Sequence, residues 1–166
     1  MRIQFTRPKD DTFKIYSKAI QKFDGRDYSH VRFSFTARRQ NVDLIYEASG
    51  DSVKFIGPEG AKFHEVVVVK EFYLDLSRDQ RDQFINYFMT MCSVKYGKLQ
   101  AIGIGVARVF GLKRNPFSRG KAHQVCSETV AIPLRDVLGI EFKKSLDLLT
   151  PRDIYEALEE YYGRTY

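Results

Sequence analysis

Tryptophan is absent from this chain of 166 residues, and cysteine occurs only twice, at Cys92 and Cys126. Two cysteines are too few for a disulfide framework, and no CxxC or His-x-x-His spacing indicates a zinc site. Apolar runs long enough to cross a bilayer are missing, as is the apolar core of a signal peptide. We therefore expect a soluble, cytoplasmic protein without a metal ion or other cofactor, in which any cysteine chemistry uses a free thiol.

Acidic residues are missing from Lys95 to Lys121, although this segment carries seven lysines and arginines. The whole chain has a formal net charge of +6, so much of its positive excess is concentrated here. Such a segment attracts an anionic partner, for example a phosphate, a lipid headgroup or nucleic acid. A solvated basic loop without a specific partner explains the composition equally well, so charge alone leaves the partner open.

Hydrophobic periodicity divides the chain into a β-rich first half and a mostly helical second half. Strict alternation from Tyr28 to Ala37 predicts a half-buried strand, and further β-prone runs predict an antiparallel sheet of four or five strands. This order of elements favours one α+β domain over residues 1–166, with the sheet packed against helices. The expected helices cover residues 11–23, a segment beginning after Ser77, residues 102–110, a short segment at Cys126, and a last helix capped by Thr150.

Two of these helices contain the cysteines. Ser77 and Gln80 form a capping-box pattern, and the helix that follows places Cys92 on an apolar stripe with Phe84, Phe88 and Met89. That spacing predicts Cys92 to be a core residue. The helix at Cys126 is expected to be only about seven residues long, because Pro133 follows and proline interrupts helical hydrogen bonding.

His30 and Cys126 are the parts from which a thiol nucleophile can be made. His30 opens the alternating run, and a strand end gives an imidazole a fixed position. Cys126 lies at a helix start, where the positive end of the helix dipole favours a thiolate. Each residue also has a structural interpretation, Cys126 as a small buried hydrophobe and His30 as a hydrogen-bonded histidine.

A nucleophile and its base commonly need a third polar group that fixes the imidazole tautomer. The strand after His30 supplies Glu47, which we select for this role. Asp43 and Asn41 on the same strand leave alternatives open, and an ordinary exposed carboxylate is the plainer interpretation of Glu47.

Four short motifs carry a family resemblance: Tyr28-Ser29-His30-Val31, Ile45-Tyr46-Glu47-Ala48, Cys126-Ser127-Glu128-Thr129-Val130 and Leu149-Thr150-Pro151-Arg152-Asp153. In this order they resemble the permuted papain-like hydrolases of the YiiX/YaeF type, within the NlpC-related superfamily. In that group the histidine precedes the cysteine along the chain, as it does here. The resemblance spans roughly Tyr28 to Leu158.

The resemblance implies a circularly permuted papain-like fold of NlpC type, with Cys126 as nucleophile, His30 as base and Glu47 as the orienting residue. It also implies amide, ester or thioester substrates, often acylated, and no cofactor. The chain departs from the family pattern where Arg32 replaces the usual glycine, and where residues 96–121 have no clear counterpart. The residues that we assign to substrate binding are Arg32, Arg119, Lys121 and His123.

Two functions follow from these residues. The first is a cysteine-dependent hydrolase or acyltransferase, such as an amidase, peptidase or thioesterase, that works through an acyl-enzyme. The second is a non-catalytic binding module on the same scaffold, which uses the basic segment of residues 95–121 to bind an anionic partner.

Overall fold

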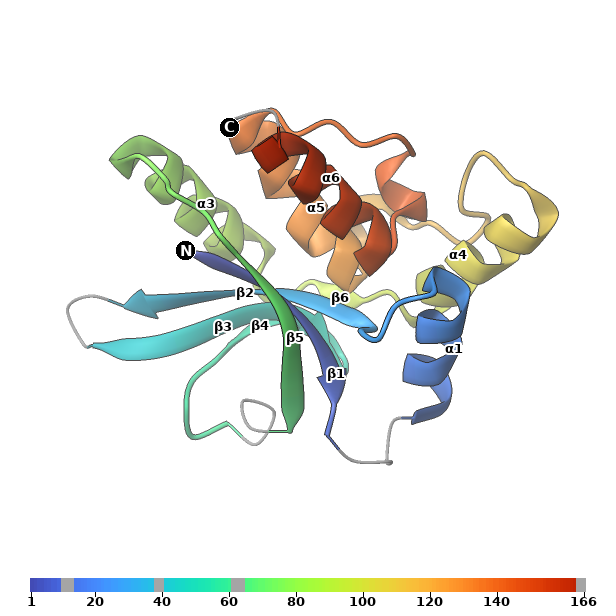
Figure 1. Ribbon diagram of the computed structural model, residues 1–166, viewed down its shortest axis with the longest axis horizontal. Helices are drawn as coiled ribbons and strands as arrows, with labels where there is room; N and C mark the ends of the chain where they lie inside the picture. The colour runs from blue at the N-terminus through green and yellow to red at the C-terminus, as the bar shows by residue number, and fades with distance from the viewer. Residues whose placement is uncertain (10–13, 38–40, 61–64, 164–166) are drawn as a thin grey trace.

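A twisted sheet of seven strands lies at the centre of the computed structural model, which describes residues 1–9, 14–37, 41–60 and 65–163 (Figure 1). The strand order is β5-β1-β2-β3-β4-β6-β7. All neighbouring pairs are antiparallel except β6 and β7, which are parallel. The strands are β1 (Arg2–Pro8), β2 (His30–Ala37), β3 (Val42–Ser49), β4 (Ser52–Ile56), β5 (Val66–Tyr73), β6 (Lys95–Tyr96) and β7 (His123–Gln124).

The helices α3, α5 and α6 cover one face of this sheet, and α1 and α4 lie at one end of the molecule (Figure 1). Every one of the expected helical segments forms, although the start of the first, at residues 11–13, is outside the described residues. The helices are α1 (Lys14–Asp24), α3 (Arg78–Met91), α4 (Lys98–Phe110), α5 (Cys126–Leu138) and α6 (Pro151–Gly163), with short 3-10 turns η2 (Gly120–Ala122) and η3 (Leu146–Leu148).

The hydrophobic core joins alternate residues of the central strands to these three helices. Phe33 of β2 is fully buried, and its ring centroid lies 5.6 Å from that of Phe84 and 5.0 Å from that of Phe88 on α3. Val31 on the same face, and Val130 and Leu134 on α5, belong to the same buried cluster. This packing fixes α5 against β2, and so fixes Cys126 relative to the start of β2.

The α+β class is confirmed, but three details of the sequence prediction are wrong. The sheet has more than the expected four or five strands, because β6 and β7 contain two residues each and are too short to show a period. The α5 helix has 13 residues and continues through Pro133 to Gly139, whose φ of 69° ends it in the left-handed conformation. Burial of the helix on both sides of Pro133 outweighs the hydrogen bond lost there.

The apolar stripe of α3 is narrower than expected. The capping box of Ser77 and Gln80 forms, and Phe84 and Phe88 are buried. Met89 is 64% exposed, however, and Cys92 lies past the helix end as a partly buried residue. The helix therefore contacts the core through its two phenylalanines, and the core assignment of Cys92 is wrong.

Candidate active site

His30 and Glu47 meet where β2 begins. The Nε2 atom of His30 lies 3.0 Å from Oε2 of Glu47, within hydrogen-bonding distance. Because β2 and β3 run antiparallel, the first residue of β2 comes level with the end of β3, where Glu47 lies. The glutamate side chain is 4% exposed and that of the histidine 21%, so the pair opens to solvent only from the histidine side.

The Cys126 thiol belongs to the same group of side chains. Burial disfavours the imidazolium of His30, but the adjacent Cys126 and Glu47 side chains favour it more, by charge and by hydrogen bonding, and raise the pKa of His30 to about 10. Since Nε2 faces Glu47, Nδ1 is the ring nitrogen left for the thiol. The structure thus brings together Cys126, His30 and Glu47 in the order needed for a nucleophile, its base and an orienting carboxylate.

Glu47 is held in its charged form by several neighbours. Its burial opposes ionisation, but His30, Ser49 and Arg32 together lower the pKa of Glu47 to about 2. The Ser49 hydroxyl donates a hydrogen bond to Oε1, and Nη1 of Arg32 lies 3.8 Å from Oε2. A permanently charged carboxylate keeps Nε2 of His30 protonated, so Nδ1 is the ring nitrogen that would exchange a proton with the thiol.

Arg32 does not fit the substrate-binding role that the sequence predicted. Its side chain is 3% exposed, and its Nε donates to Oε1 of Gln4 over 3.1 Å. The alternation of β2 explains this position, because Arg32 follows His30 by two residues and so shares its face. Arg32 is therefore a buried counter-charge for Glu47, with no surface to offer a substrate.

The other two candidates for the third residue lie away from the histidine. Asp43 accepts a hydrogen bond from the Thr36 hydroxyl over 2.7 Å and lies 3.7 Å from Arg2. Asn41 sits in the turn before β3 with a φ of 50°, a conformation that asparagine tolerates. Of the carboxylates on β3, Glu47 is the one paired with His30.

Tyr96 is a member of the site that the sequence gave no reason to select. It comes from β6, and its pKa is raised by burial and by the nearby charges of Cys126 and Glu47. Its phenol therefore stays neutral and can donate a hydrogen bond beside the thiol. Because β6 is only two residues long, no periodic pattern marked this tyrosine.

The start of α5 is anchored by the two residues that follow the cysteine. Ser127 is buried and donates from Oγ to the Leu149 carbonyl over 2.6 Å. Glu128 is 6% exposed and accepts from Nε2 of Gln100 and from the backbone N–H of Val125. Burial nevertheless raises the pKa of Glu128 to about 7. These contacts hold the first turn of α5, and with it the position of Cys126.

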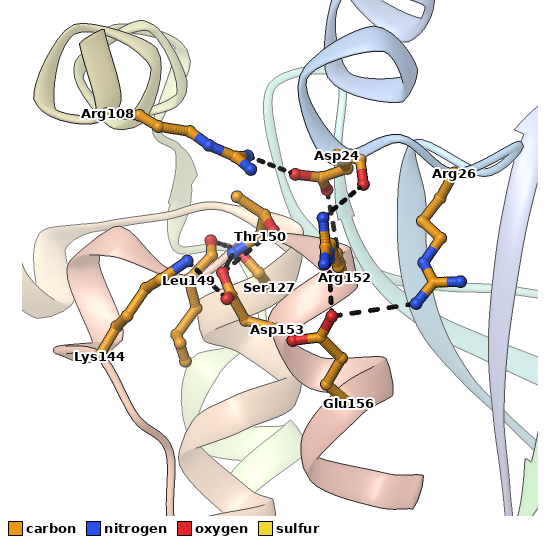
Figure 2. Close-up of polar contacts among 10 residues, drawn as sticks. All are labelled: Asp24, Arg26, Arg108, Ser127, Lys144, Leu149, Thr150, Arg152, Asp153 and Glu156. Atoms are coloured by element: carbon orange, nitrogen blue, oxygen red, sulfur yellow. Dashed lines mark hydrogen bonds and ion pairs between the residues drawn. The ribbon is translucent and has the colours of Figure 1, made fainter.

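Figure 2 shows a polar network around the start of α5. Asp24, at the end of α1, is 1% exposed and binds Nη1 of Arg108 on α4 over 2.8 Å. Its backbone carbonyl accepts from Nη1 of Arg152 on α6 over 3.2 Å, and Arg152 also binds Glu156. At the start of α6, Asp153 accepts from both the backbone N–H and the hydroxyl of Thr150. The network joins α1, α4 and α6 around the Ser127–Leu149 contact.

A pocket of about 340 Å³ lies next to Tyr96. Arg119 and His123, two of the residues assigned to substrate binding, are among the residues that line it. Lys121 falls in η2, but its side chain lies outside the described residues. A larger pocket of about 680 Å³ is formed by α3, α5 and residues 142–147, and its lining includes none of Cys126, His30 and Glu47. The lining of the smaller pocket does not include these three residues either, and it reaches the group only through Tyr96.

Within the described ranges, no three or more histidine, cysteine, aspartate or glutamate side chains are grouped so that they could hold a metal ion. In the same part of the chain, no helix is long and apolar enough to cross a membrane.

Comparison with known proteins bears on the fold of the chain. No family model matches the chain, and no curated protein matches its sequence. Among solved structures, the chain resembles the crystal structure of metalloprotein YiiX from Escherichia coli O157:H7, described as DUF1105, with a TM-score of 0.58 and 23% identity. The match covers 98% of this chain and 81% of the other. The two chains share a fold, which is the YiiX-like fold expected from the sequence motifs.

Proposed function

We propose that this chain is a permuted papain-like cysteine hydrolase or acyltransferase, with Cys126 as nucleophile, His30 as general base and Glu47 as the residue that orients the imidazole. The observation that carries the proposal is the position of His30, whose ring faces Glu47 at 3.0 Å on one side and borders Cys126 on the other. The YiiX-like fold supports it as a likeness of architecture. The neighbour is described as a metalloprotein, and the steps proposed below use side chains of the described residues alone.

In the reacting form, the proton of the Cys126 thiol is held by His30, whose pKa is raised to about 10. The thiolate then attacks the carbonyl carbon of an amide, ester or thioester, which forms a carbon–sulfur bond and an oxyanion. Backbone N–H groups at the start of α5 lie at the positive end of the helix dipole and are suited to stabilise that oxyanion. The oxyanion collapses, the bond to the leaving group breaks, and His30 returns its proton to the leaving atom.

Release of the acyl group repeats the sequence with a second nucleophile. His30 takes a proton from water or from an amine, which attacks the thioester and regenerates Cys126. Water gives a hydrolase and an amine gives an acyltransferase. Arg119 and His123 line the pocket beside Tyr96, and we propose that they contact the substrate there.

Alkylation of the two cysteines tests the proposal within one molecule. Cys126 is 7% exposed and Cys92 is partly buried, so accessibility alone would make Cys126 the slower thiol. We expect iodoacetamide to modify Cys126 faster than Cys92 at about pH 6, because only Cys126 has an adjacent imidazolium. Peptide mass spectrometry at several times gives both rates in one sample.

The variant His30→Ala should slow the alkylation of Cys126 to the rate of Cys92 or below, and leave Cys92 unchanged. Brief incubation with a p-nitrophenyl ester should place an acyl group on Cys126 in the unmodified chain and not in the variant. If Cys126 reacts no faster than Cys92 and the rate is indifferent to His30, the catalytic proposal is wrong. The non-catalytic binding module would then be the better hypothesis.

A further inference from the structure

The helix α4 is amphipathic, but it buries small and polar residues and exposes apolar ones, which is the reverse of a helix packed on a protein core. Its buried residues are Gln100, Gly103 and Ala107. Four of its large apolar residues are exposed, Leu99 by 55%, Ile102 by 47%, Val109 by 65% and Phe110 by 73%, while Ile104 and Val106 are partly buried. At 100° per residue, these four side chains fall within about 100° of the helix circumference. The helix thus turns a continuous apolar stripe toward solvent.

The chain after α4 extends this stripe. Leu112 is 42% exposed and Phe117 is 44% exposed. Phe117 lies against the helix, since a Cβ placed on Gly103 would come within 3.2 Å of its ring. We call the six residues Leu99, Ile102, Val109, Phe110, Leu112 and Phe117 the α4 surface. They are six of the eleven large apolar side chains that are exposed in the described part of the chain.

The charges of the segment that carries the α4 surface are of one sign. The segment from Lys95 to Lys121 has no acidic residue, and Lys113, Arg114 and Arg119 are exposed within it. Acidic residues of other elements contact the segment: Asp51 pairs with Lys98 at 2.8 Å and Asp24 with Arg108 at 2.8 Å, whereas Glu128 accepts from Gln100 and Asp147 from the backbone N–H of Asn115. The exposed apolar side chains are thus interleaved with cations of their own segment.

We propose that the α4 surface docks onto an anionic lipid bilayer. Apolar side chains flanked by lysine and arginine enter the boundary between headgroups and acyl chains, while the cations remain among the lipid phosphates. Figure 1 shows α4 at one end of the molecule, where a flat surface can approach it. No transmembrane segment is required, because the binding is peripheral.

The charge and the side-chain types of the α4 surface favour a bilayer over other binding partners. A second copy of this chain would place one acid-free basic segment against another, which like-charge repulsion disfavours. Nucleic acid would satisfy the cations and could stack on Phe110 and Phe117, but the aliphatic majority of the surface offers neither hydrogen bonds nor rings. An anionic membrane surface satisfies both the cations and the aliphatic side chains.

The α4 surface is continuous with the pocket beside the candidate active site. Leu99 and Phe117 belong to both, and the same pocket is lined by Tyr96, the neighbour of Cys126. A chain docked through α4 would hold this pocket at the level of the headgroups. The docking itself does not require Cys126 to react, so it can be tested separately from the proposed chemistry.

Vesicle sedimentation tests the docking. The whole chain carrying Cys126→Ala is mixed with vesicles of phosphatidylcholine, either alone or with one third phosphatidylglycerol, at low and at physiological salt. We expect binding to the anionic vesicles only, weakened by salt. The variant Phe110→Ser should lower the partition constant about tenfold, and Arg119→Gln about fivefold. The control Met89→Ser removes an equally exposed apolar residue from α3 and should bind like the parent.

Several results would overturn the docking. These are no retention on anionic vesicles, equal retention on neutral vesicles, or the same loss for Met89→Ser as for Phe110→Ser. Salt-sensitive binding to mixed nucleic acid that Phe110→Ser leaves unchanged would also overturn it, since it would assign the basic segment to nucleic acid. Fast alkylation of Cys126 together with absent vesicle binding would refute the docking and leave the cysteine chemistry standing.

Discussion

Glu47 places a negative charge in a position almost closed to water, and its neighbours determine what that charge does. It lies 3.0 Å from His30 and 3.8 Å from Arg32, and it also accepts from Ser49. Arg32 is fixed by its place in β2, whereas His30 can gain and lose a proton. In the proposed mechanism, Glu47 acts on Cys126 through the charge of the histidine, as a positioning residue.

The variant Glu47→Gln should slow alkylation of Cys126 at neutral pH by about tenfold, because loss of the carboxylate lowers the pKa of His30 and depletes the imidazolium beside the thiol. The matched control is Asp43→Asn, on the same strand but paired with Thr36 and Arg2. It should leave the rate unchanged. A melting curve of each variant separates loss of structure from loss of the charge, and an equal effect of both variants would contradict the role of Glu47.

Glu128 should make stability depend on pH. Its pKa is raised from 4.5 to about 7, so the folded state holds a proton that the unfolded state releases, and stability falls as pH rises through this range. Glu128→Gln removes this dependence. We expect the variant to match the parent near pH 4.5 and to exceed it by up to about 3 kcal/mol near pH 8. Urea unfolding at the two pH values measures the difference, and a gain that is the same at both would speak against titration of Glu128.

At this scale the sequence predicted which side chains lie together better than it predicted the contacts that support them. Cys126, His30 and Glu47 could be selected because residue type, chain order and strand position all carry information. Tyr96 could not, because nothing in a sequence shows that a two-residue strand ends beside a thiol. Arg32 was misassigned because its charge suggested solvent, whereas strand alternation places it on the face that carries Glu47.

At the scale of elements, the two glycines inside α4 differ in what surrounds them. A Cβ on Gly103 would meet Oδ1 of Asn115 at 1.9 Å, whereas a Cβ on Gly105 would meet nothing within 4 Å. Asn115 is buried and binds the backbone carbonyls of Gln100 and Asp147, so it has little freedom to retreat.

We expect Gly103→Ala to destabilise the protein by about 1–3 kcal/mol through this overlap. Gly105→Ala should stabilise it by about 0.5–1 kcal/mol, because alanine has the higher helix propensity. Thermal unfolding of the two variants side by side measures the contrast. Equal shifts of the melting temperature would mean that Gly103 is not a close-contact position.

The α5 helix shows why element boundaries were harder to predict than element types. A proline interrupts a helix when only local hydrogen bonding is considered, and Pro133 therefore predicted an end. In the fold, Val130, Ala131 and Leu134 are buried on either side of it, and their packing keeps the helix intact to Leu138. The packing energy that carries α5 past Pro133 comes from contacts with β2 and β3, which lie far away in the sequence.

At the scale of the whole molecule, Asp24 holds three elements together. It binds Arg108 on α4 through its side chain and Arg152 on α6 through its backbone (Figure 2). We expect Asp24→Asn to lower the free energy of unfolding by about 1–3 kcal/mol, since the guanidinium of Arg108 loses its charged partner. The control Asp27→Asn changes an exposed carboxylate three residues away and should have almost no effect. Urea denaturation gives both values, and equal stabilities would show that the network contributes little.

The α+β class and the presence of the strands up to β5 follow from period and turn signals, whereas the strand order and the addition of β6 and β7 to the sheet do not. Those two strands are distant in sequence and pair in parallel, so their association depends on the placement of α4 between them. The exposed apolar stripe of α4 could be recognised only once the elements packed around the helix were known, since an apolar helical pattern normally predicts burial.

The charges of the side chains around Cys126 balance one another. In the proposed mechanism, the charges of the Cys126 thiolate, the His30 imidazolium, Glu47 and Arg32 sum to zero. Acylation of Cys126 would remove the thiolate, which is one of the two anions beside His30. Having given its proton to the leaving group, His30 would then have a lower proton affinity and stay neutral until it deprotonates the incoming water or amine. The bond formed in the first proposed half-reaction would thus set the proton affinity of His30 for the second.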